Sequence, residues 1–230
     1  MKMGFNEKVH AYLAARYYEQ LKEQFGERGK AAFIHAVQYY GLQRGRRMAQ
    51  RAIHDGKPLT HPTFMEYNEL LESKDQDVVP ADGELESLSP DYVLHITNCP
   101  WHDQFQAMGC LEAGGVYCSY IDEAISRGFN PDIIFRADKN LNTDDYCDHR
   151  VVGVCYNSFP DAPQRKDYAH TFDYHCGHLY WSFREAVTAI FGAEGEQISA
   201  NILRKFTEDY GEEMANRLVS YQNYNFNVCQ

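Results

Sequence analysis

The chain lacks any long run of apolar residues. A helix that crosses a bilayer needs about 20 consecutive, mostly apolar residues, and no stretch of the 230 residues approaches that length. Residues 1–8 also lack the apolar core of a secretory signal peptide. We therefore expect a soluble, cytoplasmic protein that does not bind a membrane.

Positive charge is also scarce. The chain has 22 Lys and Arg residues against 33 Asp and Glu residues, which gives a formal net charge of −11. Phosphate binding requires a cationic surface, so this balance argues against nucleic acid as a partner. The one basic cluster, Arg44-Gly45-Arg46-Arg47 followed by Arg51, lies on a predicted helix, and we interpret it as a solvated helix face.

A regular cysteine framework is absent as well. Seven cysteines is an odd number, and their spacing does not repeat. In a chain without export features they are expected to be reduced, and to be buried, metal-bound or catalytic. Five of the seven lie between Tyr92 and Tyr156, so we look for functional residues there.

What the chain does contain predicts an α+β protein. The apolar fraction of 44% and the aromatic fraction of 14% are those of a globular protein with a buried core. Apolar residues recur with helical spacing in residues 10–72 and again in 170–225, whereas residues 91–156 show strand alternation around one helix. We expect a single domain, 1–230, in which a small mixed or antiparallel sheet with an inserted helix is flanked by N-terminal and C-terminal helical hairpins.

The boundaries of the central elements follow from the same patterns. Strands are expected at 92–99, 132–137 and 146–156, and the inserted helix is expected at 114–125. Residues 72–90 are rich in Asp, Glu, Ser and Pro, which favours an exposed connection.

The helical parts also resemble one another. Glu19-x5-Phe25-Gly26-x2-Gly29 recurs 166 residues later as Glu185-x5-Phe191-Gly192-x2-Gly195. The match is consistent with a duplicated helical hairpin, and equally with two helix–glycine–helix turns that look alike. In either case Gly26 is expected to end a helix.

These elements group several side chains that could take part in catalysis or metal binding. On the first strand the period of two puts His95 and Cys99 on one face, and on the last strand it groups Cys147 with His149. Each of them also has an ordinary interpretation, as a buried thiol or a hydrogen-bonded core histidine.

On the inserted helix, Cys118 and Asp122 are four residues apart and therefore lie on the same side. They border the apolar arc that contains Tyr117. A carboxylate at the edge of a packed face is poorly hydrated, so Asp122 is expected to be paired or to have a perturbed pKa, unless it merely caps a neighbouring loop.

Four short motifs follow one another in the central part of the chain: Cys99, Cys118-x3-Asp122, Phe129-Asn130-Pro131 and Asp144-Asp145-Tyr146-Cys147-Asp148-His149-Arg150. Their order resembles that of the L-2-amino-thiazoline-4-carboxylic acid hydrolase family. The leading helices, with Phe25-Gly26 and Arg44-Gly45-Arg46-Arg47, fit the same pattern, so the resemblance spans residues 25–150. A weaker likeness, in architecture only, connects the chain with four-vinyl-reductase-like small-molecule-binding domains.

The resemblance implies a hydrolase that acts on carbon–nitrogen bonds other than peptide bonds and that opens a cyclic isothiourea or amidine-like substrate at a C–N or C–S bond. An amidine-type carbon can be attacked by a thiolate, while a carboxylate holds its cationic N–H groups and a base activates water. The candidate catalytic residues are Cys118, Asp122, Cys99, His149 and His95. The candidate substrate-binding residues are Cys147, Tyr117, Asp145, His175 and His178.

Two alternatives use overlapping residues. Cys99, Cys118, Cys147 and His149 are of the types that form a tetrahedral site for zinc or another divalent metal, although we expect no cofactor. His170-x4-His175-x2-His178, with Asp173, is either a second metal or acid–base set or aromatic packing at a seam.

A third interpretation is a non-enzymatic sensor domain that binds a small molecule or a metal. We favour the hydrolase, with a small-molecule substrate as its partner, and leave a homo-oligomer open.

Overall fold

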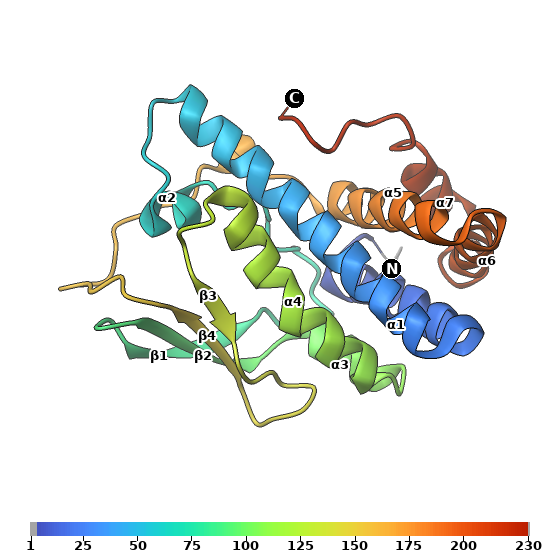
Figure 1. Cartoon of the computed structure of the whole chain (residues 1–230), viewed down its shortest axis with the longest axis horizontal. Coiled ribbons are helices and arrows are strands. Elements are labelled where there is room, and N and C mark those ends of the chain that lie inside the picture. Colours follow the sequence, from blue (N-terminus) through green and yellow to red (C-terminus); the bar gives the residue numbers. More distant parts are fainter. Residues whose placement is uncertain (1–3, 230) are drawn as a thin grey trace.

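Helix α4 packs on a four-stranded sheet, the N-terminal hairpin α1 packs on α4, and the C-terminal helices pack on α1 (Figure 1). The structure is a computed structural model that describes residues 4–229. It confirms the α+β class, with helices flanking an antiparallel sheet. The helices are α1 (Glu7–His54), α2 (His61–Glu66), α3 (Pro100–Ala107), α4 (Leu111–Phe129), α5 (Phe172–Phe191), α6 (Ala193–Tyr210) and α7 (Glu212–Val219). The strands are β1 (Asp82–Ser87), β2 (Tyr92–Asn98), β3 (Phe135–Ala137) and β4 (Cys147–Val151).

Helix α1 bends back on itself at Gly26. This residue has a φ of 57° and a ψ of −131°, a conformation that glycine adopts and side chains disfavour. The two arms then lie side by side: the rings of Tyr18 and Phe33 are 5.1 Å apart, and His10 Nε2 is 3.0 Å from the Tyr40 hydroxyl oxygen. The predicted break at Gly26 is confirmed.

The internal sequence match corresponds to a repeated turn. Gly192, between α5 and α6, has a φ of 60° and a ψ of −130°, nearly the angles of Gly26. The phenylalanines that precede the two glycines, Phe25 and Phe191, stack on each other with ring centroids 3.9 Å apart. The two hairpins therefore share a turn geometry and meet at their turns.

The strand order is β1-β2-β4-β3, and all neighbours are antiparallel. Leu94 lies opposite His149 and His95 lies opposite Asp148. Directly paired residues project from the same face, so Cys147 and His149 point to the face that contacts α4, and His95 points to the other face.

Two elements were missed in the sequence. Strand β1 lies within residues 72–90, where we predicted an exposed connection; that prediction is wrong. Its sequence is acidic and mostly exposed, because an edge strand is held by backbone hydrogen bonds to its neighbour and needs no apolar face. Helix α3 has only eight residues and begins with Pro100, a residue suited to the first turn of a helix.

Two glycines let α1 and α4 approach closely. A Cβ atom at Gly41 would lie 2.7 Å from the Cβ of Ala124, and one at Gly45 would collide with the carbonyl oxygen of Ile125. This spacing brings the intervening Arg44 next to α4. In the part of the chain that the structure describes, no helix combines the length and the apolar character needed to cross a bilayer.

Replacing Gly45 with alanine is expected to destabilise the fold. The added Cβ forces α1 and α4 apart, and overpacking of this kind lowers the free energy of unfolding by about 1–3 kcal/mol. Urea unfolding, followed by circular dichroism, measures the loss.

Gly115→Ala is the matched control. It lies inside α4, and its Cβ would meet Thr143 Cγ2 at 3.4 Å, an ordinary contact. Alanine favours a helix over glycine by roughly 1 kcal/mol, so this variant should be neutral or more stable. Equal losses at the two positions would contradict the tight contact of α1 with α4.

Candidate active site

Three thiols lie where α3, α4 and β4 meet. Cys99 precedes α3, Cys118 lies on α4 and Cys147 begins β4. Burial, followed by the proximity of Cys99 and Cys147, raises the pKa of Cys118 well above its usual value. The three thiols are thus close enough to influence one another's pKa, and we call them the thiol cluster; all three cysteines are free.

Cys99 occupies the N-cap position of α3. Burial raises the pKa of its thiol, and the backbone N–H groups of His102 and Trp101 act in the opposite direction. The positive end of a helix dipole also favours a thiolate. Cys99 is therefore the member of the cluster best arranged to carry negative charge.

The other two thiols are held by the loop before β4. The side-chain amide of Asn142 donates to Cys118 Sγ at 3.5 Å, and the backbone N–H of Leu141 donates to Cys147 Sγ at 3.4 Å. Burial raises the pKa of Cys147 to about 11. At neutral pH both thiols keep their protons.

Asn142 was missed by the sequence analysis. Its side chain packs directly on Gly114, where any Cβ would overlap the amide. The signal was present as the Gly114-Gly115 pair inside a strong helix, since a helical glycine often marks close approach by another segment. His102 Nδ1, 3.3 Å from Asn142 Oδ1, connects this loop to α3.

Asp122 has His149 as its partner. Asp122 Oδ2 is 3.7 Å from His149 Nε2, and the two side chains are 38% and 29% exposed. The charge of Asp122 also raises the pKa values of Cys118, Cys147 and Cys99, after burial and other causes. An acid–base pair accessible to solvent thus borders the thiol cluster.

The structure does not bring every predicted site residue to this place. His95 lies on the opposite face of the sheet, where its Nε2 is 3.3 Å from Asp148 Oδ1 and its ring lies 4.2 Å from that of Tyr146. Asp145 is exposed in the turn before β4. The residues that do converge are Cys99, Cys118, Cys147, Asp122 and His149.

The basic cluster is buried, and the prediction of a solvated helix face is wrong. Arg44, Arg47 and Arg51 are 7%, 1% and 4% exposed, and of these neighbours on α1 Arg46 alone is exposed. The reason is Glu69, which is fully buried and accepts hydrogen bonds from Arg47 Nε at 3.3 Å and from an Arg51 amine at 3.0 Å.

His175 and His178 belong to this second cluster. An Arg47 amine donates to His178 Nδ1 at 3.2 Å, and His178 Nε2 donates to Gln43 Oε1 at 2.8 Å. His175 Nε2 donates to the Glu69 carbonyl oxygen at 3.1 Å, and its Nδ1 has no partner among the described residues. Burial, assisted by Arg44, lowers the pKa of His175 to about 3, so the ring is neutral.

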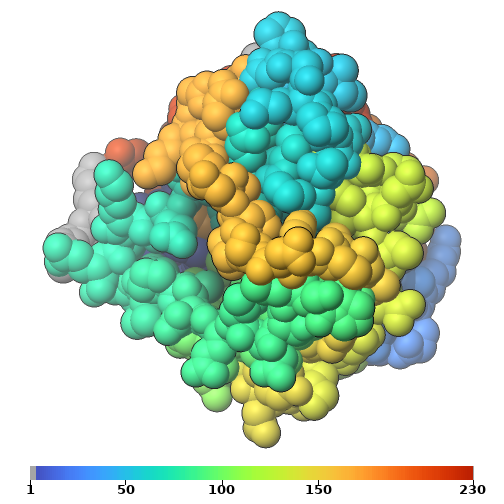
Figure 2. Space-filling model, turned by 90° about the vertical axis from the view of Figure 1, so that its left-hand side faces the viewer, coloured from blue at the N-terminus to red at the C-terminus, as the bar shows by residue number. Residues whose placement is uncertain are grey.

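Tyr117 lies between the two clusters. It is 3% exposed, and its ring centroid is 6.2 Å from that of His10. Trp101, two residues after Cys99, donates its indole N–H to His10 Nδ1 at 3.1 Å. Figure 2 shows a recess between the teal segment near residues 70–85 and the orange segment near 160–175, with the dark blue start of α1 at its floor.

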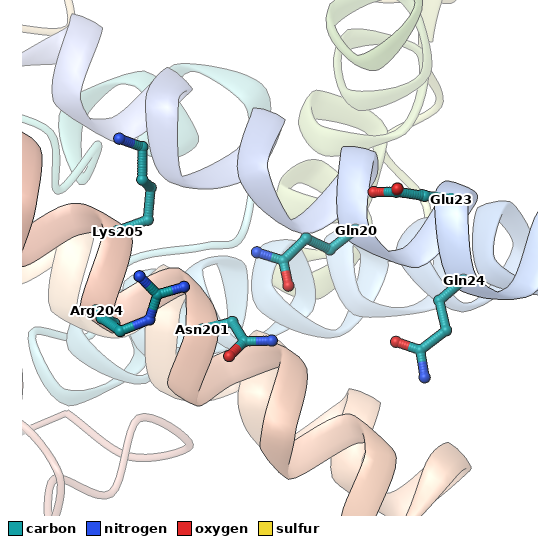
Figure 3. Close-up of a pocket in the computed structure, with 6 residues that line it drawn as sticks. All are labelled: Gln20, Glu23, Gln24, Asn201, Arg204 and Lys205. Carbon is teal, nitrogen blue, oxygen red and sulfur yellow. The ribbon is translucent and has the colours of Figure 1, made fainter.

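Two hollows lie apart from the thiols. One, of about 290 Å³, is bordered by Arg51, His170 and Tyr174. The other, of about 580 Å³, lies between the first arm of α1 and α6 (Figure 3). Its lining is entirely polar: Gln20, Glu23, Gln24, Asn201, Arg204 and Lys205. Neither hollow is lined by a cysteine.

The cofactor expectations stay predictions. Within residues 4–229, no group of three or more His, Cys, Asp or Glu side chains has the arrangement of a metal site. This holds for the cysteine set and for the set around His170, His175 and His178.

The fold and the site define a class: an α+β protein in which a helix bearing a thiol and a carboxylate packs on an antiparallel sheet bearing a thiol and a histidine. The chain belongs to the L-2-amino-thiazoline-4-carboxylic acid hydrolase family, whose model matches residues 6–151. This range includes the five converging residues, Arg44 and Glu69; His175 and His178 lie outside it. No curated protein and no solved structure matches the chain.

The buried histidines predict a loss of stability at mildly acidic pH. Burial is the largest cause that lowers the pKa values of five histidines: His10, His61, His170, His175 and His178. In the unfolded chain their pKa is about 6.5. Below that pH the unfolded chain takes up protons that the folded protein does not, so the free energy of unfolding falls as the pH drops from 6.5 towards 4.

Urea unfolding between pH 7.5 and 4.5 tests this. His61, far from the thiols, has its pKa lowered to about 4, so His61→Asn should reduce the pH dependence by up to one proton. The matched control is His35→Asn, at an exposed position on α1. A free energy of unfolding that stays constant down to pH 5 contradicts the assignment of neutral buried histidines.

Proposed function

We propose that the protein hydrolyses a small cyclic isothiourea or amidine-like molecule, such as L-2-amino-thiazoline-4-carboxylate, and that Cys99 is the nucleophile. The observation that carries the proposal is the position of Cys99. Its sulfur lies at the start of α3, where two backbone N–H groups favour the thiolate, and it is within electrostatic reach of Asp122, the partner of His149. Membership of a family named for this hydrolysis supports the reaction class.

The reaction needs a thiolate that the empty site disfavours. Burial raises the pKa of Cys99, so its proton must leave when the substrate arrives. His149, paired with Asp122 at the solvent edge, is the group that accepts this proton. A cationic amidine near the sulfur further favours the charged form, because opposite charges lower the pKa of a thiol.

The proposed chemistry proceeds in two halves. The Cys99 thiolate attacks the ring carbon that is bonded to two nitrogens and sulfur, and a tetrahedral adduct forms. The C–S bond of the ring breaks, because a thiolate leaves more readily than a nitrogen anion, and the released sulfur takes a proton from His149. Water, activated by the same histidine, then attacks this carbon; the Cys99 thiol leaves, and an open-chain urea with a free thiol results.

Asp122 has a separate role in this proposal. Its carboxylate is partly exposed and faces the thiols, so it can accept hydrogen bonds from the two cationic N–H groups of the amidine. Cys118 and Cys147, whose thiols stay protonated, line the site and take no part in the bond changes.

Substitution of Cys99 tests the assignment. Cys99→Ala should lower kcat by at least about 1,000-fold, since loss of a nucleophile removes the covalent route. It should change the dissociation constant of L-2-amino-thiazoline-4-carboxylate by only a few fold. An assay of thiol release over time measures kcat, and calorimetry on the inactive variant measures the dissociation constant.

Cys118→Ala is the matched control, because it removes a neighbouring thiol that burial keeps protonated. This variant should keep at least a tenth of the turnover. The opposite pattern, with Cys118 essential and Cys99 dispensable, would refute the choice of nucleophile. Unchanged turnover in both variants would refute thiol catalysis.

A further inference from the structure

Arg44 is a buried cation without a complete set of partners. Its side chain is 7% exposed, and its Nε has no hydrogen-bonding partner among the described residues. The nearest carboxylate oxygen, Glu69 Oε1, is 3.5 Å from this nitrogen. A buried N–H without an acceptor is costly, so such an atom in a folded protein requires an explanation.

Glu69 does not supply the missing contact: its Oε1 lies 3.5 Å from Arg44 Nε and forms no hydrogen bond with it. Its two oxygens already accept hydrogen bonds from Nε and one amine of Arg47 and from one amine of Arg51. Arg47 also donates to the carbonyl oxygen of Phe226, and Arg51 donates to His170. Both of these arginines form hydrogen bonds within the fold, whereas Arg44 Nε forms none.

The charges around Glu69 do not balance. Three buried guanidinium groups share one buried carboxylate, and the neighbouring His10, His175 and His178 are neutral. A water molecule could satisfy the free N–H of Arg44, but it would not offset the excess positive charge. An uncompensated buried charge is unfavourable, and a bound anion relieves it.

Arg44 also lies near α4, because the glycines on either side of it in α1, Gly41 and Gly45, touch that helix. Burial works against its charge, while Tyr40, Glu69, Tyr117 and Asp122 raise the pKa of Arg44. Tyr117 and Asp122 lie on α4, the helix that carries Cys118. The close contact of Gly41 and Gly45 with α4 holds Arg44 in this position.

We propose that Arg44 binds the carboxylate of the substrate, and that the site therefore selects small molecules with a carboxylate at one end and a cationic amidine at the other. This inference rests on the proposed function. The amidine end pairs with Asp122 and the carboxylate end with Arg44, so each charge of the ligand meets the opposite charge. A guanidinium suits this role because its planar N–H groups match a carboxylate.

Binding measurements on the inactive Cys99→Ala background test the proposal without turnover. The probes are L-2-amino-thiazoline-4-carboxylate and 2-amino-thiazoline, the same ring without the carboxylate. With Arg44 present, calorimetry should show the carboxylate compound binding roughly 10- to 100-fold more tightly, the usual size of a charge-assisted contact. With Arg44→Gln, the two compounds should bind about equally.

Arg46→Gln is the matched control, since it removes the same charge from an exposed position on the same helix. It should leave the preference for the carboxylate compound intact. Arg44→Lys, which keeps the charge without the Nε donor, should restore part of the preference. Without ligand, Arg44→Gln should melt no lower than its parent, because it removes a surplus buried charge; a large drop would indicate a structural role and overturn the inference.

Two further results would overturn it. One is an equal affinity for the two compounds when Arg44 is present. The other is a preference that survives in Arg44→Gln. Failure of the proposed function gives a different result. If the protein with Cys99 intact shows no turnover but the Arg44-dependent preference is found, then Arg44 binds the carboxylate and the proposed reaction is wrong.

Discussion

The rest of the structure depends on the buried carboxylate of Glu69. It contacts Arg44, Arg47 and Arg51 of the second arm of α1, and its backbone carbonyl receives the N–H of His175 from α5. Removing this carboxylate would leave buried arginine charges unpaired, and a loss of this kind typically costs about 3–5 kcal/mol. Glu69 thus joins the N-terminal hairpin, through its side chain, to the C-terminal hairpin, through its backbone.

This network divides three neighbouring arginines into two roles. Arg47 and Arg51 donate hydrogen bonds to Glu69, and Arg47 also holds the C-terminal segment by donating to the carbonyl oxygen of Phe226. Arg44 lies one turn nearer the thiols and keeps an unused donor. In our proposal, the excess positive charge near Glu69 is offset by the carboxylate of the bound substrate.

The thiol site depends on a second constraint, the tight contact between α1 and α4. Gly41 and Gly45 permit it, and it places Arg44 on the same side of α4 as Tyr117. Asp122 of the same helix meets His149 of β4 and is also among the groups that raise the pKa of Arg44. Helix α4 is thus the element that brings cation, carboxylate and sulfur together.

Much of the fold could be predicted from local patterns. Gly26 and Gly192 predicted the hairpin turns. The spacing of Cys118 and Asp122 correctly placed both residues on one side of a helix. Contacts between distant segments could not be derived in this way. Nothing near Glu69 in the sequence indicates that three arginines converge on it, so the basic cluster was mistaken for surface.

In the sheet, the face to which each side chain points was similarly ambiguous. Alternation correctly grouped Cys147 with His149, but the grouping of His95 with Cys99 was wrong, because the strand ends at Asn98 and Cys99 begins α3. The register between strands then decides which groups meet. That register separates His95 from His149 and places them on opposite faces. The loop residue Asn142 was invisible to periodicity, because it acts through its amide and belongs to no regular element.

The most direct test is a crystal structure of the Cys99→Ala variant with L-2-amino-thiazoline-4-carboxylate bound. The account predicts the ring between Asp122 and residue 99, with the carboxylate within hydrogen-bonding distance of the Arg44 guanidinium. A ligand found elsewhere, for example in the hollow beside Arg51 and Tyr174, or a reversed ligand with its carboxylate away from Arg44, would contradict it.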